Sequence, residues 1–173
     1  MDTVLEILKL TIPGLIVFAT AYFVLKQYLD NQRAIKQIEL KQNQQNTTTP
    51  LRLQAYERLS LLCERMALPS LMLRLRQDGT SSAQFRATLL LAIQQEYEYN
   101  ITQQVYVSEQ LWEIIKLSRD DSMNTISLAY ELVDPKAESD ELAQAIMSIL
   151  EKRGVTAIDK ALIAIKKEAA ILF

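Results

Sequence analysis

The chain has 173 residues and a formal net charge of −2, with 23% charged residues, so it carries no strong field of either sign. This balance argues against a nucleic-acid partner, which would require a basic surface. The sequence contains no histidine, the commonest general base and metal ligand. Its glycines, Gly14, Gly79 and Gly154, are too far apart to form a phosphate-binding loop. We therefore expect no catalytic activity, cofactor, metal or small-molecule substrate.

An apolar stretch dominates the beginning of the chain. Residues 10–25 contain no charged side chain and lie between Lys9 and Lys26. When the stretch is extended back to include residues 4–25, it reaches the roughly 20 residues that a helix needs to cross a bilayer. We therefore expect a transmembrane helix over residues 1–28, with lipid contact through residues 4–25.

Two other interpretations of this stretch stay open. The small residues Ala19 to Ala21 resemble a signal-peptidase site, but Asp2 and Glu6 stand where a signal peptide carries a basic cluster. A buried helix of a soluble domain is the second alternative, although such helices seldom lack polar residues on every face.

The charges on either side of the stretch predict its orientation. Asp2 and Glu6 precede it, with Lys9 at its edge, whereas four basic residues follow it: Lys26, Arg33, Lys36 and Lys41. An excess of lysine and arginine marks the cytoplasmic side of a membrane. We therefore expect the N-terminus to face outward and the rest of the chain to be cytoplasmic, an environment that also suits the single free thiol of Cys63.

A polar segment follows the apolar stretch. Leu29, Ile35 and Ile38 leave a thin apolar stripe among helix-forming residues, which allows a solvated stalk or a loose coiled coil. Residues 42–50 read QNQQNTTTP, an uncharged run ending in proline that is typical of a linker. We expect a helical stalk and polar linker over residues 29–50, and whether the stalk is a continuous helix stays open.

The remaining residues, 51–173, show helical periodicity and predict an all-α bundle of about five or six helices. The first helix has an apolar face formed by Ala55, Tyr56, Leu59, Leu62, Cys63 and Met66. Turn and capping residues predict the other helices: Pro69 to Gln77, Ser82 to Tyr99, a helix capped by Ser108, one from Pro135 to Gly154, and one capped by Thr156. A kink or break near Asp120 in the helix after Ser108 stays open.

Aromatic and basic residues give a candidate partner-binding surface. Tyr97, Tyr99, Tyr106 and Trp112 lie close together in the sequence, and aromatic side chains are enriched at interaction sites. They are equally typical of a helical core. Arg58 and Arg65 complete the predicted surface. The alternative for these arginines is an ordinary solvated surface, in which they pair with the glutamates between them.

Two further groups are weaker candidates for chemistry. Cys63 lies on an apolar helix face and cannot form a cysteine–histidine pair, so we interpret it as a small buried hydrophobic residue. Glu96 and Glu98 are two positions apart and do not share a helix face, so we interpret them as solvated surface residues.

Two segments, LRLQAYERLSLLCERM and QQEYEYNITQQVYVSEQLWEIIK, resemble an uncharacterised family of bacterial single-pass membrane proteins. The resemblance covers nearly the whole chain. It implies an N-terminal anchor in the bacterial inner membrane, a stalk and a cytoplasmic helical domain. The family has no assigned activity, so the resemblance assigns no residue a role.

These observations favour a non-enzymatic adaptor, scaffold or accessory subunit that is anchored in the membrane and binds a protein partner. A structural homo-oligomer that self-associates through the stalk is the alternative. An enzyme is the third and weakest hypothesis.

Overall fold

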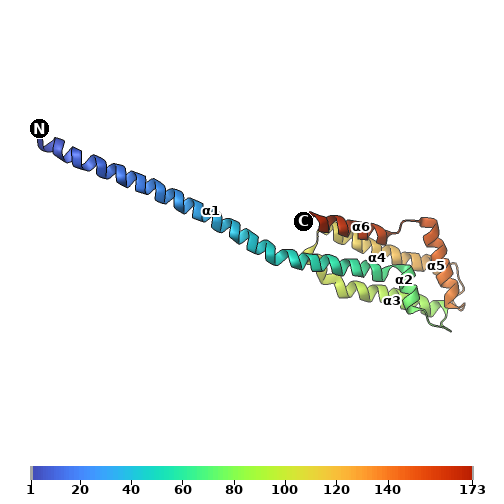
Figure 1. Ribbon diagram of the computed structural model, residues 1–173. Helices are drawn as coiled ribbons and strands as arrows, with labels where there is room; N and C mark the ends of the chain where they lie inside the picture. Colours follow the sequence, from blue (N-terminus) through green and yellow to red (C-terminus); the bar gives the residue numbers. More distant parts are fainter. Residues whose placement is uncertain (1, 173) are drawn as a thin grey trace. The chain divides into compact units, whose positions relative to one another are not determined.

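The computed structural model describes the backbone of residues 2–172 and the side chains of residues 13–33, 35–37, 39 and 48–172. Between residues 2 and 172 the chain forms α-helices and short 3₁₀ helices and no strand, which confirms the all-α class (Figure 1). The elements are α1 (Asp2–Met66), α2 (Leu68–Leu75), α3 (Ser82–Asn100), η1 (Ile101–Tyr106), α4 (Glu109–Tyr130), α5 (Ser139–Arg153), α6 (Ala157–Ala169) and η2 (Ala170–Leu172).

The chain divides into two compact units, Met1–Thr48 and Thr49–Phe173, and α1 belongs to both. Residues 42–50, which the sequence predicts to be a polar linker, are helical in the structure, so α1 continues through them without interruption, a point that the sequence leaves open. Glutamine is a good helix former, and no glycine follows Gly14 within α1. Pro50 is therefore the only strong helix breaker in this part of the chain.

The apolar side chains described in the first unit are exposed on the surface of α1. All the side chains described between residues 13 and 33 are exposed, including Leu15, Ile16, Val17 and Phe18. Within the part of the chain whose side chains are described, no helix is both long enough and apolar enough to cross a membrane. The predicted transmembrane helix over residues 1–28 is therefore not supported, and its side chains up to residue 12 lie outside the described residues.

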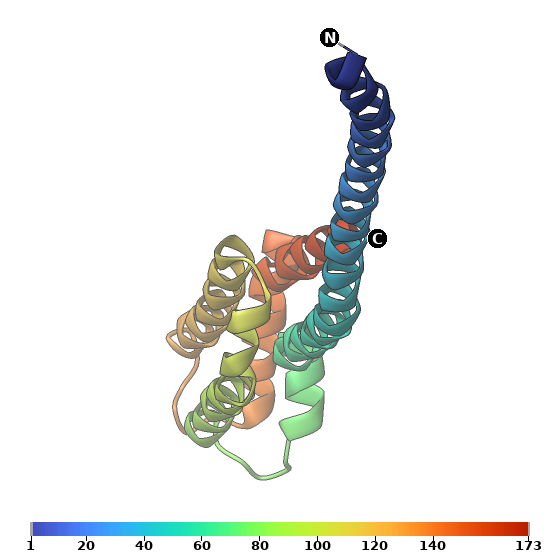
Figure 2. The same ribbon diagram turned by 90° about the vertical axis from the view of Figure 1, so that its left-hand side faces the viewer.

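The core of the second unit lies between the amphipathic helices. The apolar face predicted for the end of α1 is buried, from Ala55 to Met66. In α3 the buried side chains recur every fourth residue, at Phe85, Leu89, Ile93 and Tyr97, which places them on one face. Helix α4 contacts α3, α5 and α6 and so brings the later helices onto the same core (Figure 2).

The predicted helix starts at Ser82, Ser108 and Thr156 are confirmed to within one residue. The Ser81 side chain accepts a hydrogen bond from the Gln84 backbone at the start of α3, and the Ser108 side chain accepts one from Leu111 at the start of α4. Thr156 forms a capping box with Asp159. The backbone N–H and hydroxyl of Thr156 donate to this carboxylate and lower its pKa.

The helix expected to open at Pro135 begins at Ser139 instead. Backbone hydrogen bonds join the start of α5 to the start of α3. Ser82 donates its backbone N–H to the Ala137 carbonyl at 2.8 Å, and Ser139 donates its backbone N–H to the Thr80 carbonyl at 3.0 Å. These bonds join segments far apart in the sequence. They compete with helix formation at Pro135, and a local capping pattern cannot reveal them.

Helix α4 continues without interruption past Asp120, so the break that the sequence allows there is absent. Ser118 and Ser122 lie on its buried face. Their hydroxyls donate to the Ile115 and Ser118 carbonyls, so these small polar side chains enter the core with their hydrogen bonds made.

Replacing a buried leucine of α3 tests this core. We expect Leu89→Ala to lower the free energy of unfolding of the second unit by about 2–5 kcal/mol, because it leaves a cavity in a fully buried position. Leu91→Ala is the matched control, since Leu91 is 58% exposed on the same helix, and we expect a change within about 0.5 kcal/mol. Trp112, the only tryptophan, reports urea unfolding by its fluorescence. Equal losses for the two variants would contradict the proposed core.

Candidate functional site

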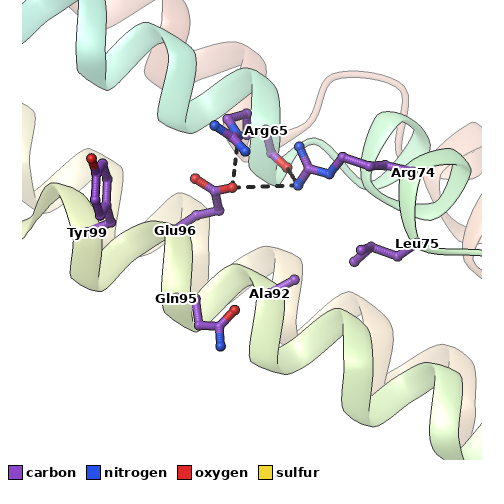
Figure 3. Close-up of a pocket in the computed structure, with 7 residues that line it drawn as sticks. All are labelled: Arg65, Arg74, Leu75, Ala92, Gln95, Glu96 and Tyr99. Carbon is purple, nitrogen blue, oxygen red and sulfur yellow. Dashed lines mark hydrogen bonds and ion pairs between the residues drawn. The ribbon is translucent and has the colours of Figure 1, made fainter.

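Two arginines and one glutamate meet where α1, α2 and α3 come together (Figure 3). Arg65 Nε lies 2.8 Å from Glu96 Oε1, and Arg74 Nη2 lies 3.7 Å from the same oxygen. Arg74 also donates to the backbone carbonyl of Arg65 at 3.4 Å. The Glu96 side chain is only 17% exposed, whereas both arginine side chains are much more open to solvent.

The turn between α1 and α2 places the second arginine beside the first. Ala67 adopts an extended conformation after the end of α1, and Pro69 lies in the first turn of α2, where proline is favoured. Burial of Leu68 and Leu71 then fixes the rotation of α2 and leaves Arg74 on its open side, facing α3.

A groove of about 400 Å³ surrounds this cluster and is lined by Arg65, Arg74, Leu75, Ala92, Gln95, Glu96 and Tyr99. Leu75 and Ala92 supply an apolar wall. Tyr99 stands at the end of the groove beyond Glu96, with its side chain 76% exposed (Figure 3). We call this feature the two-arginine groove.

The charges of the two-arginine groove do not balance. Arg65 and Arg74 bring two positive charges to the single carboxylate of Glu96, which leaves a surplus of one positive charge. An arginine guanidinium has five donors in a planar arrangement and binds carboxylates in a bidentate manner. The groove is therefore suited to bind a second carboxylate beside Glu96.

The structure brings only two of the six predicted partner-binding residues into this groove, Arg65 and Tyr99. Tyr97 and Trp112 are buried and stack on each other with ring centroids 5.5 Å apart, so neither ring is open to a partner. Arg58 is exposed on α1 and does not line the groove. Tyr106 accepts a hydrogen bond at its carbonyl from Arg52, away from the groove residues.

Arg74 is one of several arginines that the sequence concentrates after residue 51 and that could face lipid headgroups or an acidic partner, but the predicted six-residue surface does not include it, and Glu96 is interpreted there as solvated surface. The periodicity of α3 contained a weak signal, because Glu96 directly precedes Tyr97 and so lies at the edge of the buried face. A charged residue at such an edge is often held by a neighbouring helix. The sequence alone did not show which helix would supply the partner.

A second polar cluster joins α1, α4 and α6. The Glu168 carboxylate accepts hydrogen bonds from the Tyr56 hydroxyl at 3.1 Å and from the backbone N–H of Ser108 at 2.8 Å. The Ser108 hydroxyl and Arg52 complete the cluster. Burial and the adjacent Glu168 raise the pKa of Tyr56. Because each group in this cluster binds another helix, we interpret it as a structural clasp, and we call it the Glu168 clasp.

The Cys63 side chain is fully buried. Burial, with a smaller contribution from Glu64, raises the pKa of its thiol to about 12. A thiol must lose its proton to act as a nucleophile, so Cys63 is unreactive at neutral pH. This agrees with its interpretation as a core residue.

We expect the native protein to react negligibly with Ellman's reagent at about pH 8, because the Cys63 thiol is buried and stays protonated well above that pH. In denaturant the same thiol should react fully, since unfolding restores its ordinary pKa and its exposure. The absorbance of the released thiolate measures both reactions. Equal rates in the two states would show that the thiol is accessible in the native protein.

Removing the shared carboxylate tests the two-arginine groove. We expect Glu96→Gln to lower the free energy of unfolding by about 0.5–1 kcal/mol at low salt, because two partly exposed ion pairs are lost. The loss should shrink at high salt, where these pairs are screened. Glu98→Gln, on the exposed side of the same helix, is the control and should change the free energy of unfolding by only a few tenths of a kcal/mol. An effect no larger than that of the control would contradict the geometry of Glu96.

Comparison with known proteins gives a family without an assigned role. The model of a family of unknown function, DUF7935, matches residues 2–172. Neither the curated proteins nor the solved structures include a significant match to this chain. Since the match covers nearly the whole sequence and both units, the chain belongs to the family of unknown function DUF7935.

Proposed function

We propose that this protein is a membrane-anchored interaction module without catalytic activity, acting as an adaptor, scaffold or accessory subunit. The first unit would hold it in a bacterial inner membrane, and the second unit would bind a protein partner at the cytoplasmic face. One observation carries the proposal: the apolar side chains after residue 13 are exposed on every face of α1.

Consecutive exposed residues support the membrane anchor. Leu15, Ile16, Val17 and Phe18 follow one another, and successive residues of an α-helix point about 100° apart. They therefore present apolar surface around the whole circumference of α1. Exposing such surface to water is unfavourable by roughly 25 cal/mol per Å², and a helix that is apolar all round is stable in lipid or among other apolar helices.

The charged residues that follow support the proposed orientation. Lys26, Arg33 and Lys36 come directly after the apolar segment and are exposed. Basic residues next to a span are retained on the cytoplasmic side. The second unit, which follows them in the chain, would then lie in the cytoplasm.

The features of the second unit favour a binding role for the protein over a catalytic one. Its cysteine is buried with a raised pKa, and the sequence supplies no histidine to activate a hydroxyl or a thiol. The two-arginine groove instead offers an open site with surplus positive charge and an exposed aromatic ring. Such features recognise partners, since arginine and tyrosine are enriched among the residues that dominate binding energy.

A homo-oligomer assembled through the stalk is the second candidate. Leu29 and Ile35 are exposed on α1 and could pair with the same residues of another chain. The predicted third stalk residue, Ile38, lies outside the described side chains.

Charge placed inside the apolar segment tests the anchor. We expect the native protein to stay in the membrane pellet after alkaline carbonate extraction. The variant Val17→Arg/Ala21→Arg should be released, because each arginine in the bilayer centre costs roughly 2.5–3.5 kcal/mol. Gln27→Arg/Asn31→Arg is the matched control, with the same spacing beyond the apolar segment, and should stay in the pellet. Release of the native protein would contradict the proposal.

The molar mass of the extracted native protein in mild detergent then separates the two candidates. A monomer excludes the homo-oligomer. A defined oligomer that dissociates in Leu29→Ala/Ile35→Ala favours it over an adaptor.

A further inference from the structure

We infer that the two-arginine groove binds an acidic peptide segment of a partner protein, with a partner carboxylate bound by Arg65 and Arg74 beside Glu96. The inference rests on the proposed interaction function and specifies the chemistry of the partner. In the bound state this carboxylate would join Glu96, and two carboxylates would then face two guanidinium groups.

The geometry leaves donors free for such a ligand. Glu96 Oε1 is the common acceptor for Arg65 and Arg74, but only Arg65 holds it at a short distance, 2.8 Å against 3.7 Å. Arg74 also donates a hydrogen bond to the Arg65 carbonyl. A guanidinium has five donors, so both arginines retain N–H groups that can turn toward the open side of the groove. Charge-assisted hydrogen bonds of this kind are stronger than neutral ones.

The partial burial of Glu96 fixes the arginines before a ligand arrives. Its carboxylate lies between the helices, and one of its oxygens contacts both Arg65 and Arg74, as Figure 3 shows. Preorganised side chains lose less rotamer entropy on binding, which leaves more of the interaction energy for affinity. Arg58 on α1 has no such partner among the described residues and does not line the groove.

The rest of the groove favours a peptide over a small anion. Leu75 and Ala92 form an apolar wall, and the exposed Tyr99 ring stands beyond Glu96. A peptide can place an apolar side chain against this wall while its carboxylate binds the arginines. Tyrosine supplies a large contact area at low entropic cost, which suits this role.

The same charges disfavour a phosphate group, whether on a lipid or on a phosphoprotein. A phosphomonoester carries about −1.5 to −2 charges at neutral pH, more than the single surplus positive charge of the groove. It would also lie beside the Glu96 carboxylate, which repels it more strongly than it repels a monoanion. A carboxylate of charge −1 therefore matches this groove better.

A display library of short random peptides, selected on the full-length protein in phosphatidylcholine nanodiscs, tests the inference. We expect the enriched peptides to share an aspartate or glutamate next to an apolar residue. Arg65→Gln/Arg74→Gln should weaken their binding about tenfold or more, because charge-assisted hydrogen bonds are lost. Tyr99→Ala should weaken it to a smaller degree. Arg58→Gln removes a neighbouring arginine of α1 that is outside the groove, and should leave binding unchanged.

Three results would overturn the inference: enriched peptides without acidic residues, equal binding to the double variant, or selective competition by millimolar inorganic phosphate that depends on Arg65. The last would assign the groove to phosphorylated ligands. Trp112 fluorescence shows that each variant is folded. Carbonate extraction of the same proteins separates the two proposals, since a protein that stays in the membrane without binding acidic peptides contradicts only the inference about the groove.

Discussion

Burial of one apolar face of α1 and one face of α3 in a shared core is the constraint on which the geometry of the two-arginine groove depends. Leu59, Cys63 and Met66 are buried in the same cluster as Leu89 and Ile93. This shared burial fixes the rotation of both helices about their axes. Charged residues at the edges of the two buried faces then come opposite each other, so the position of the two-arginine groove follows from hydrophobic packing and not from the charges themselves.

The ion pairs of the two-arginine groove differ in stoichiometry from two ion pairs elsewhere in the second unit. Arg76 pairs with Asp140 and Arg153 with Asp121, one cation to one anion. In the groove two cations share one half-buried anion. The folded state tolerates this arrangement because both arginines remain partly in water, where desolvation costs little. The surplus therefore stays available to a ligand at small cost to stability.

Much of the fold could be predicted from local patterns. The buried face from Ala55 to Met66 and the Thr156 capping box follow from periodicity and from interactions within one turn. The start of α5 could not be predicted, because bonds to a distant loop decide it. For the candidate site, Tyr99 and Arg65 were predicted together, but Tyr97 and Trp112 face the core. Composition cannot separate aromatic residues that bind partners from those that pack inside.

The Glu168 clasp has a consequence for the order in which the second unit folds. Glu168 accepts hydrogen bonds from residues 60 and 112 positions earlier, at the start of α4 and in α1. Contacts of such high sequence separation form slowly, since a long loop must close first. During synthesis the apolar face of α4 cannot pack against α6 until α6 has left the ribosome. Nascent chains of this protein should therefore be clients of chaperones that shield helical segments, up to the moment when α6 docks.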